Sequence, residues 1–291
     1  MGAKPLKWRV IEKARNVHEL RLASSLKAGS EAWQLYIADA HWDHPKCNLS
    51  LLKSHLDEAR ERGAAIVSVG DLFCAMQGKG DPRGDKESLR PEHQKGNYLD
   101  SLVYTSADWF APYRDYFAVA GLGNHETSVY KHHETCLIER LCQSLRDKGG
   151  ITRKGGYTGW IRSMFIRDNG RQSYSYRVFY HHGAGGGGPV TKGAIDYNRM
   201  AEYVDADAFV SGHVHWKNNT PVQRVRLNDA STITNSQMHY IRCGTYKDEW
   251  EDGHAGFHVE KGRGPRPLGG WWVRFGLRDS RLTVEWVEAK A

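Results

Sequence analysis

The chain has few cysteines and no long apolar run, and each shortage excludes a class of protein. Its five cysteines are an odd number without CxxC spacing, which argues against a disulfide framework and a structural zinc site. No apolar run approaches the roughly 20 residues of a membrane-spanning helix. The first twenty residues lack the apolar segment of an export signal, and Leu6 breaks a myristoylation-like start. We therefore expect reduced thiols, no membrane association and a cytoplasmic location.

Size and charge narrow the class further without naming a partner. A chain of 291 residues can bury a large core, and we expect one domain over residues 1–291. Residues 78–97 are polar and rich in Gly and Pro, which indicates a loop insertion directly after a strand. The formal net charge of +7 favours a polyanionic partner, although a generally basic surface is the alternative. The oligomeric state is not predicted.

A short apolar run that stops at a polar cluster recurs five times along the chain. The five segments are WQLYIADAH (33–41), AAIVSVGD (64–71), YFAVAGLGNH (116–125), YRVFYHH (176–182) and DAFVSGHVH (207–215). Runs of this length predict buried strands. Apolar spacing predicts helices over residues 50–62 and about 133–145, so an α/β sheet begins early in the chain. Residues 155–178 predict hairpins, and the C-terminal third predicts a second, more antiparallel sheet.

The polar residues that end these strands predict a metal site, because ligands gather at the carboxyl ends of parallel strands. The candidates are Asp39, His41, Asp71, Asn124, His125, His181 or His182, His213 and His215. Carboxylates and imidazoles suit Mn²⁺, Fe or Zn²⁺, and no thiolate is expected in any cluster. On an extended backbone, residues two apart leave on one face, as expected for Asp39 with His41 and for His213 with His215. Glycines 70, 123 and 212 each precede a candidate, where the chain is expected to turn closely past bound metal.

The order of the motifs resembles the signature of the calcineurin-like metallophosphoesterase superfamily. The chain reads DAH at 39–41, GD at 70–71, GNHE at 123–126, HH at 181–182 and GHVH at 212–215, so the match spans residues 33–216. The resemblance implies an α/β fold, a four-layer αββα sandwich of two mixed sheets, and a binuclear metal centre.

Carried over residue by residue, the resemblance also implies a ligand set. Asp39, His41 and His215 would bind the first metal, and Asp71 would bridge both. Asn124, His213 and one strand-end histidine would hold the second metal. His181 follows three apolar residues and is favoured for that position, whereas His182 directly precedes Gly183 and is the alternative, as a ligand or as a residue behind the ligands.

The implied chemistry is hydrolysis of a phosphate ester by a hydroxide formed between two divalent ions. Mn²⁺ is the first expectation, with Fe, Zn²⁺ or Ni²⁺ as alternatives. His125 follows a ligand and is assigned as the general acid, or as a hydrogen-bond donor to the transition state. Glu126 would orient His125 or support the ligands, and an exposed loop carboxylate is the alternative.

Four flanking residues are candidate substrate contacts: His44, Trp42, Trp216 and Lys192. Trp42 and Trp216 each follow a ligand and could stack a base, although most tryptophans are core. A helix-entry turn explains the sequence around His44 equally well. The glycine-rich stretch 183–188 lacks the GK[ST] of a P-loop, so a loop that offers Lys192 to phosphate is the more modest hypothesis.

The basic charge and the aromatic residues beside ligands favour a phosphodiesterase acting on nucleic acid or nucleotides. A phosphomonoesterase such as a protein phosphatase is the alternative within the class. A scaffold that kept the fold and lost catalysis is the alternative outside it, and it predicts gaps among the ligands, of which the sequence has none.

Overall fold

Two mixed sheets form the centre of the computed structural model, which describes residues 7–75, 89–166, 173–186, 188, 194–227, 229–250, 253–254 and 257–290. The six-stranded sheet has the order β13 (Arg281–Glu288), β12 (Trp271–Arg278), β3 (Glu31–Ile37), β4 (Ala65–Ser68), β5 (Phe117–Ala120) and β6 (Arg153–Lys154). The seven-stranded sheet has the order β1 (Trp8–Ala14), β2 (Val17–Leu22), β7 (Thr158–Ile166), β8 (Ser173–His181), β9 (Ala208–Ser211), β11 (Ile233–Arg242) and β10 (Asn218–Leu227).

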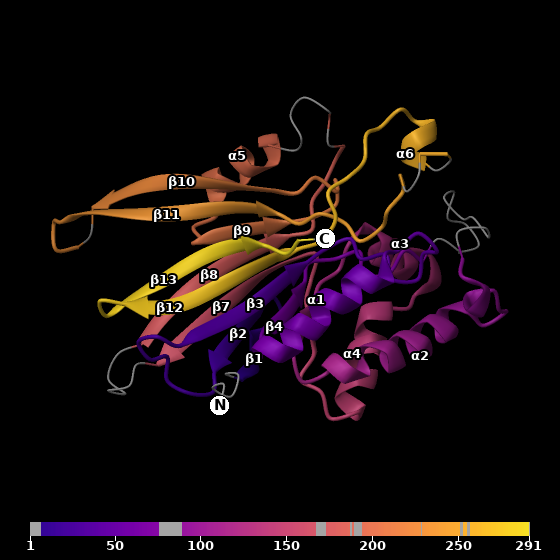
Figure 1. Cartoon of the computed structure of the whole chain (residues 1–291), viewed down its shortest axis with the longest axis horizontal. Coiled ribbons are helices and arrows are strands. Elements are labelled where there is room, and N and C mark those ends of the chain that lie inside the picture. The colour runs from indigo at the N-terminus through magenta and orange to yellow at the C-terminus, as the bar shows by residue number, and fades with distance from the viewer. Residues whose placement is uncertain are drawn as a thin grey trace.

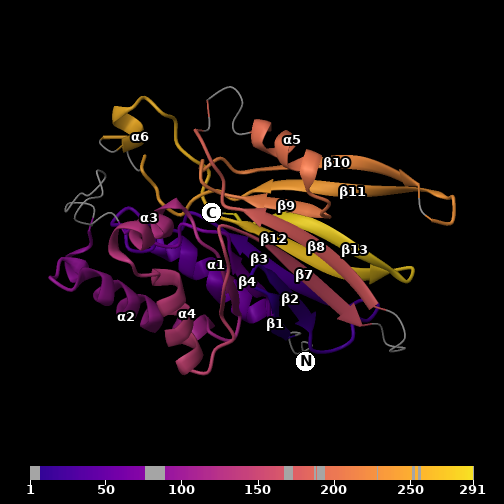
Figure 2. The same ribbon diagram turned by 180° about the vertical axis from the view of Figure 1, so that it is seen from behind.

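Helices cover the outer faces of both sheets, as Figures 1 and 2 show. The helices of the described chain are α1 (Leu49–Arg62), α2 (Tyr98–Phe110), α3 (Asn124–His133), α4 (Leu137–Asp147), α5 (Ala194–Tyr203) and α6 (Phe257–Glu260), with short 3₁₀ turns η1 (Pro91–His93) and η2 (Ala111–Tyr113), and α6 lies in a loop apart from both sheets. Among the described residues, no helix is both long and apolar enough to cross a bilayer.

Three apolar clusters separate the layers. Successive residues of a strand face opposite sides of a sheet, so in β4 the side chain of Ile66 packs under α1, α2 and α4 while Val67 packs between the two sheets. On the far face of the seven-stranded sheet, Met200 of α5 packs on Phe209 and Tyr240. The order helix, sheet, sheet, helix confirms the predicted four-layer αββα sandwich.

All five strands predicted from the polar-ended runs are present, as β3, β4, β5, β8 and β9. The strands β3, β4 and β5 are mutually parallel, and so are β8 and β9, which places their carboxyl ends along one edge of the sandwich. The first predicted helix is α1, which is capped by Asn48 and ends at Gly63 with φ 65°. The second was predicted too early, because Glu134 adopts φ 53° and ends α3 before α4 begins.

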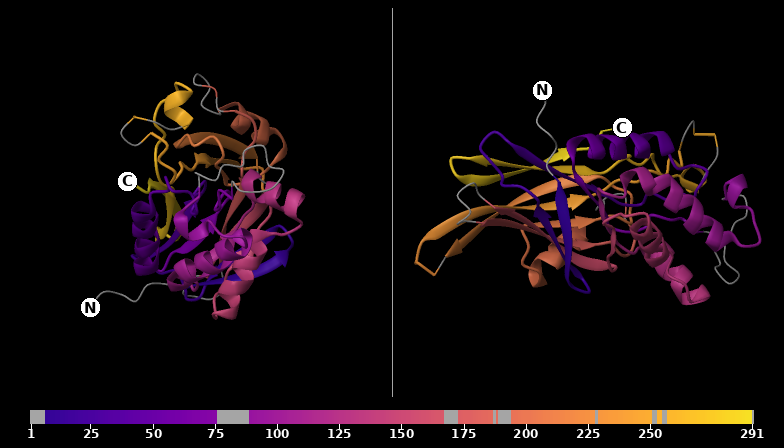
Figure 3. Two further views of the ribbon diagram at one scale, coloured as in Figure 1. Left: turned by 90° about the vertical axis from the view of Figure 1, so that its right-hand side faces the viewer. Right: turned by 90° about the horizontal axis from the view of Figure 1, so that it is seen from below.

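The predicted C-terminal sheet does not exist as a separate unit. β12 pairs antiparallel with β3, so the last hairpin extends the first sheet, while β10 and β11 extend the other sheet next to β9. Figure 3 shows these hairpins reaching away from the helices. Of the predicted insertion at 78–97, residues 78–88 lie outside the described residues, and the remainder contains η1.

Candidate metal centre

The motif residues follow five strand ends that belong to both sheets. Asp39 and His41 follow β3, Asp71 follows β4 and Asn124 follows β5, all from the six-stranded sheet. His182, His213 and His215 come from the seven-stranded sheet, after β8 and β9. The candidate centre therefore lies where the two sheets meet at their carboxyl ends.

The first group consists of Asp39, His41 and His215, whose ligand atoms lie within 4.8 Å of one another. Nε2 of His41 is 3.4 Å from Nε2 of His215, and Oδ1 of Asp39 is also 3.4 Å from that His215 nitrogen. Oδ2 of Asp39 accepts a hydrogen bond from the backbone N–H of His213 at 2.8 Å. One carboxylate thus faces the first group and also fixes the loop that carries the second.

The second group consists of Asp71, His182 and His213, again within 4.8 Å. Oδ2 of Asp71 is 3.2 Å from Nε2 of His182. Oδ1 of Asn124 lies between the two histidines, 3.2 Å from Nε2 of His182 and 2.8 Å from Nδ1 of His213. Every residue predicted as a ligand is close to one of the two groups, except His181.

The preference for His181 is not met by the geometry. Nδ1 of His181 accepts a hydrogen bond from the backbone N–H of Gly183 at 2.9 Å, and its ring lies against Tyr157. His182 is fully buried and points to Asp71 and Asn124. The reason is strand alternation: Tyr176, Val178 and Tyr180 point inward along β8, and residue 182 continues that phase.

Backbone strain is concentrated at these residues. Ten described residues other than glycine have positive φ, and five of them are Asp39, His41, Asp71, His213 and His215. Each such conformation costs on the order of 1–3 kcal/mol and persists where the surroundings enforce it, typically at functional sites. The prediction that each pair lies on an extended backbone is therefore wrong. Asp39 and His41, and likewise His213 and His215, adopt left-handed conformations beyond the strand ends.

The donor set fits divalent metal ions. Within the described chain, Oδ1 of Asp39 forms no hydrogen bond, and bulk water cannot reach it either, because the residue is completely inaccessible to solvent. A buried carboxylate oxygen without a partner is costly unless a cation or a donor satisfies it. Carboxylate, amide and imidazole ligands are those that Mn²⁺, Fe and Zn²⁺ share.

Electrostatics in the second group also favour positive charge. Burial alone would raise the pKa of Asp71, but the neighbouring His182 and His125 hold that pKa well below its usual range. Burial alone would lower the pKa of His182, but the carboxylate of Asp71 raises it to about 9. The carboxylate of Asp71 therefore stays ionised beside a protonated His182. A bound metal ion would supply the positive charge in place of the His182 proton.

His125 lies beside the first group, and a backbone carbonyl fixes its ring. Nδ1 of His125 donates to the carbonyl oxygen of Cys74 at 2.5 Å, and the two rings of His125 and His41 are 4.8 Å apart. Because Nδ1 carries its proton toward a carbonyl, Nε2 is the nitrogen that faces the centre, 3.9 Å from Oδ2 of Asp71.

Glu126 does not orient His125, and it is not an exposed loop carboxylate. Its side chain is buried and accepts three backbone hydrogen bonds, from Gly123 at 2.8 Å, Asp71 at 3.1 Å and Phe73 at 2.9 Å. Burial, followed by the nearby Asp71, raises the pKa of Glu126 to about 8. Glu126 therefore caps α3 and ties the GNHE loop to the GD loop.

Sequence reasoning missed the group that orients the Cys74 carbonyl. The buried carboxylate of Asp43 accepts hydrogen bonds from the backbone N–H groups of Cys74 at 2.6 Å and Ala75 at 2.9 Å, and from the Tyr98 hydroxyl at 3.2 Å. Asp43 belongs to the segment around His44, for which the sequence offers either a substrate contact or a helix-entry turn. The signal in the sequence was an acidic residue two positions after His41, with neither Lys nor Arg directly beside it to form an ion pair.

The predicted substrate contacts have different outcomes. Trp42 is 3% exposed and packs with Phe73 and Trp109, so it is a core residue. His44 is 7% exposed, its Nδ1 accepts from the backbone N–H of Lys46, and burial lowers its pKa to about 3. Trp216 is half-buried beneath the guanidinium of Arg266, whose Cζ lies 4.1 Å from the ring centroid. Lys192 lies outside the described residues.

Comparisons with known proteins give weak similarities. No protein-family model matches the chain, and a search of curated proteins found no match. A conserved uncharacterized protein of Streptococcus pneumoniae TIGR4, a predicted phosphoesterase, is 10% identical, with 89% of this chain and 91% of that chain covered and a TM-score of 0.31. Vps29 of Entamoeba histolytica, complexed with Zn²⁺, is 12% identical over 89% and 99%, with a TM-score of 0.32. A metallophosphoesterase of Sphaerobacter thermophilus is 14% identical over 88% of both chains, with a TM-score of 0.30.

TM-scores of this size support no inference about function. The function of this chain has to be inferred from its own residues and their geometry. Two of the three proteins are described as phosphoesterases. The ordered motifs resemble the signature of the calcineurin-like metallophosphoesterase superfamily, and they lie at one end of a four-layer αββα sandwich.

Proposed function

We propose that the chain is a metal-dependent phosphoesterase that works with two divalent ions. The observation that supports this most strongly is the convergence of two separate three-residue groups from four strand ends of two sheets. Asp39, His41 and His215 would hold one ion. Asp71, His182 and His213, with the amide oxygen of Asn124, would hold the other, and Asp71 would bridge the pair.

The ions, once bound, would neutralise charge on the phosphoryl oxygens and acidify a water molecule between them. The chain supplies the proton for the leaving group. Since the Cys74 carbonyl holds the proton on Nδ1 of His125, a proton that the ring takes up in the catalytic cycle would sit on Nε2, the nitrogen that faces the centre. From there it can pass to the departing oxygen, which makes His125 the general acid.

For the substrate we propose a phosphodiester of a nucleic acid or nucleotide. One support is the net charge of +7. The other is Arg266, whose guanidinium stacks on the ring of Trp216, the residue that follows His215. Within the described chain, Nε and Nη1 of Arg266 are buried and have no hydrogen-bond partner, an unmet donor capacity that the anionic group of a bound substrate would satisfy. Mn²⁺ is the proposed metal, and the cytoplasmic location stays a prediction.

The test is hydrolysis of bis(p-nitrophenyl) phosphate and p-nitrophenyl phosphate by protein loaded with Mn²⁺. We expect the diester to be preferred, Asp71→Asn to lose bound metal and activity together, and His125→Ala to keep its metal while kcat falls by about 10²–10⁴-fold. Asp108→Asn, an exposed carboxylate of α2, is the matched control and should behave as the wild type.

Different outcomes overturn different parts of the proposal. A clear preference for the monoester would replace the diesterase by the phosphomonoesterase. Full activity in both Asp71→Asn and His125→Ala would show that hydrolysis does not occur at this centre. Elemental analysis of the same samples separates loss of metal from loss of the acid.

A further inference from the structure

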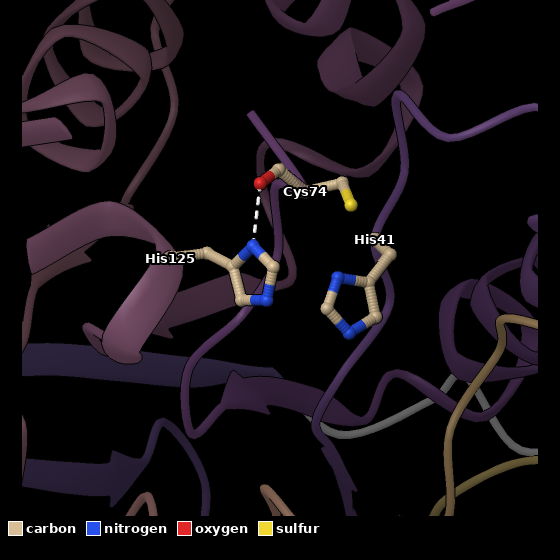
Figure 4. A group of neighbouring side chains, drawn as sticks. All are labelled: His41, Cys74 and His125. Atoms are coloured by element: carbon tan, nitrogen blue, oxygen red, sulfur yellow. Dashed lines mark hydrogen bonds between the residues drawn. The ribbon is translucent and has the colours of Figure 1, made fainter. Parts of the chain in front are cut away.

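A third group of potential ligands lies beside the centre and contains a thiol. His41, Cys74 and His125 each offer one ligand atom, and these atoms lie within 4.8 Å of one another (Figure 4). The sequence had predicted that no thiolate would be present in any cluster. The loop that follows Asp71 brings Cys74 there, where the side chain is 2% exposed.

The three side chains are already oriented toward a common point. One ring nitrogen of His125 is bound to the Cys74 carbonyl, and Figure 4 shows the other nitrogen turned toward His41. In the same view, the sulfur of Cys74 lies on the His41 side of its own backbone.

An independent observation comes from the His41 ring, which is 2% exposed. Its Nε2 faces His215 in the first group, whereas its Nδ1 is buried and has no hydrogen-bond partner among the described residues. A buried ring nitrogen without a partner is an unmet binding capacity.

We propose that Cys74, His41 and His125 form a site for a thiolate-binding divalent cation such as Zn²⁺ or Cd²⁺. A sulfur with two imidazoles is a donor set that suits these ions better than Mn²⁺, which prefers oxygen. On binding, the Sγ–H bond breaks and a metal–sulfur bond forms, while the thiol proton and any proton on Nε2 of His125 leave to solvent. A water molecule completes the tetrahedral shell.

Occupation of this site blocks catalysis. The cation takes Nε2 of His125, the atom that would otherwise deliver the proton, and it competes for the ring of His41. Soft divalent ions therefore inhibit the manganese-loaded protein. This consequence rests on the proposed function, whereas cation binding itself does not.

Binding is tested on the metal-free full chain by titration with Cd²⁺, which gives an ultraviolet charge-transfer band when it binds a thiolate. We expect the band to saturate at one Cd²⁺ per chain in the wild type and to be absent in Cys74→Ser and Cys74→Ala. The matched control is Cys136→Ser, which keeps a capping side chain at the start of α4 and should keep the band. Equal bands in the Cys74 variants, or no band in the wild type, would overturn the proposal. Circular dichroism identifies which variants are folded.

Inhibition is tested on protein loaded with excess Mn²⁺, with each variant compared to its own rate without Cd²⁺. Cys74→Ser should need more than about tenfold more Cd²⁺ for half-inhibition than the wild type, because one of three ligands is lost. The same half-inhibition in both would reject the inhibitory role. An inactive wild type that still shows the band would instead reject the proposed function and leave the site standing.

Discussion

His125 owes its orientation to Asp43, a residue that contacts neither candidate metal group directly. Asp43 holds the backbone of Cys74 and Ala75, and the Cys74 carbonyl in turn holds Nδ1 of His125. At the scale of single residues, the orientation of the proposed general acid therefore depends on a buried carboxylate that acts through the backbone.

Removal of that carboxylate should affect catalysis more than metal binding. Asp43→Ala leaves two buried N–H groups without an acceptor, each worth roughly 1–3 kcal/mol, so the 72–75 loop should shift and carry the Cys74 carbonyl away from His125. We expect kcat to fall by about tenfold or more with KM little changed. Tyr98→Phe removes one of three hydrogen bonds to Asp43 and should give a smaller fall. Loss of metal from Asp43→Ala, by elemental analysis, would assign Asp43 to the metal centre instead.

The motif residues of the centre could be predicted from the sequence, because polar side chains at strand ends are visible in the apolar pattern. The choice between the two adjacent histidines could also have been made. Tyr176, Val178 and Tyr180 share one face of β8, so His182 is in phase with the core and His181 is not. The apolar residues directly before His181 were a weaker guide than the alternation of side chains between the two faces of the strand.

At the scale of elements, the turns after the strands make the centre, and they could not be predicted. The sequence indicated extended pairs, but left-handed residues at Asp39, His41 and Asp71 form sharp turns instead. Asp and His adopt left-handed conformations more often than most residues, but the large majority of them do not, so the tertiary contacts of the loops decide the conformation and the residue type alone does not predict it. Only the glycines before the ligands pointed to a tight approach.

Gly123 should be essential for that approach. Its φ of −114° is accessible to any residue, but a Cβ here would lie 2.0 Å from Oδ1 and 2.5 Å from the backbone nitrogen of Asp71. Gly123→Ala should therefore displace Asp71 and reduce the metal retained per chain, with a loss of stability of about 1–3 kcal/mol. Gly96→Ala, where a Cβ meets nothing within 4 Å, is the matched control. Unchanged metal content in Gly123→Ala would show that Asp71 is not a ligand.

At the scale of the molecule, pairing between distant segments closes the fold. β12 joins β3 across more than two hundred residues, and His55 of α1 contacts both Tyr246 and the carbonyl of Lys290 near the C-terminal end. The class of fold was predictable from the order of strands and helices. The membership of each sheet was not, since local sequence carries no information on which strand lies beside which.

His55 should make stability depend on pH. Nε2 donates to the Lys290 carbonyl and Nδ1 accepts from Tyr246, so the buried ring is neutral, and burial lowers its pKa from 6.5. The native state then binds a proton more weakly than the unfolded chain, so the stabilisation is complete above the unfolded pKa and is lost as the pH falls below it.

The measurement is the free energy of unfolding by urea at about pH 7.5 and about pH 5.5, where one group changes it by at most about 1.4 kcal/mol per pH unit. His55→Gln should lose less stability on acidification than the wild type. His132→Gln, an exposed histidine of α3, should lose as much as the wild type. Identical acid sensitivity in His55→Gln and the wild type would exclude the effect.

Both candidate metal groups draw ligands from the two sheets at once: Asp39 and His41 with His215, and Asp71 with His182 and His213. Each bound ion would consequently cross-link the sandwich at one end, where the apolar layer between the sheets gives way to polar loops. Removal of the ions would release that end of the sandwich, while the apolar layer holds the other end closed.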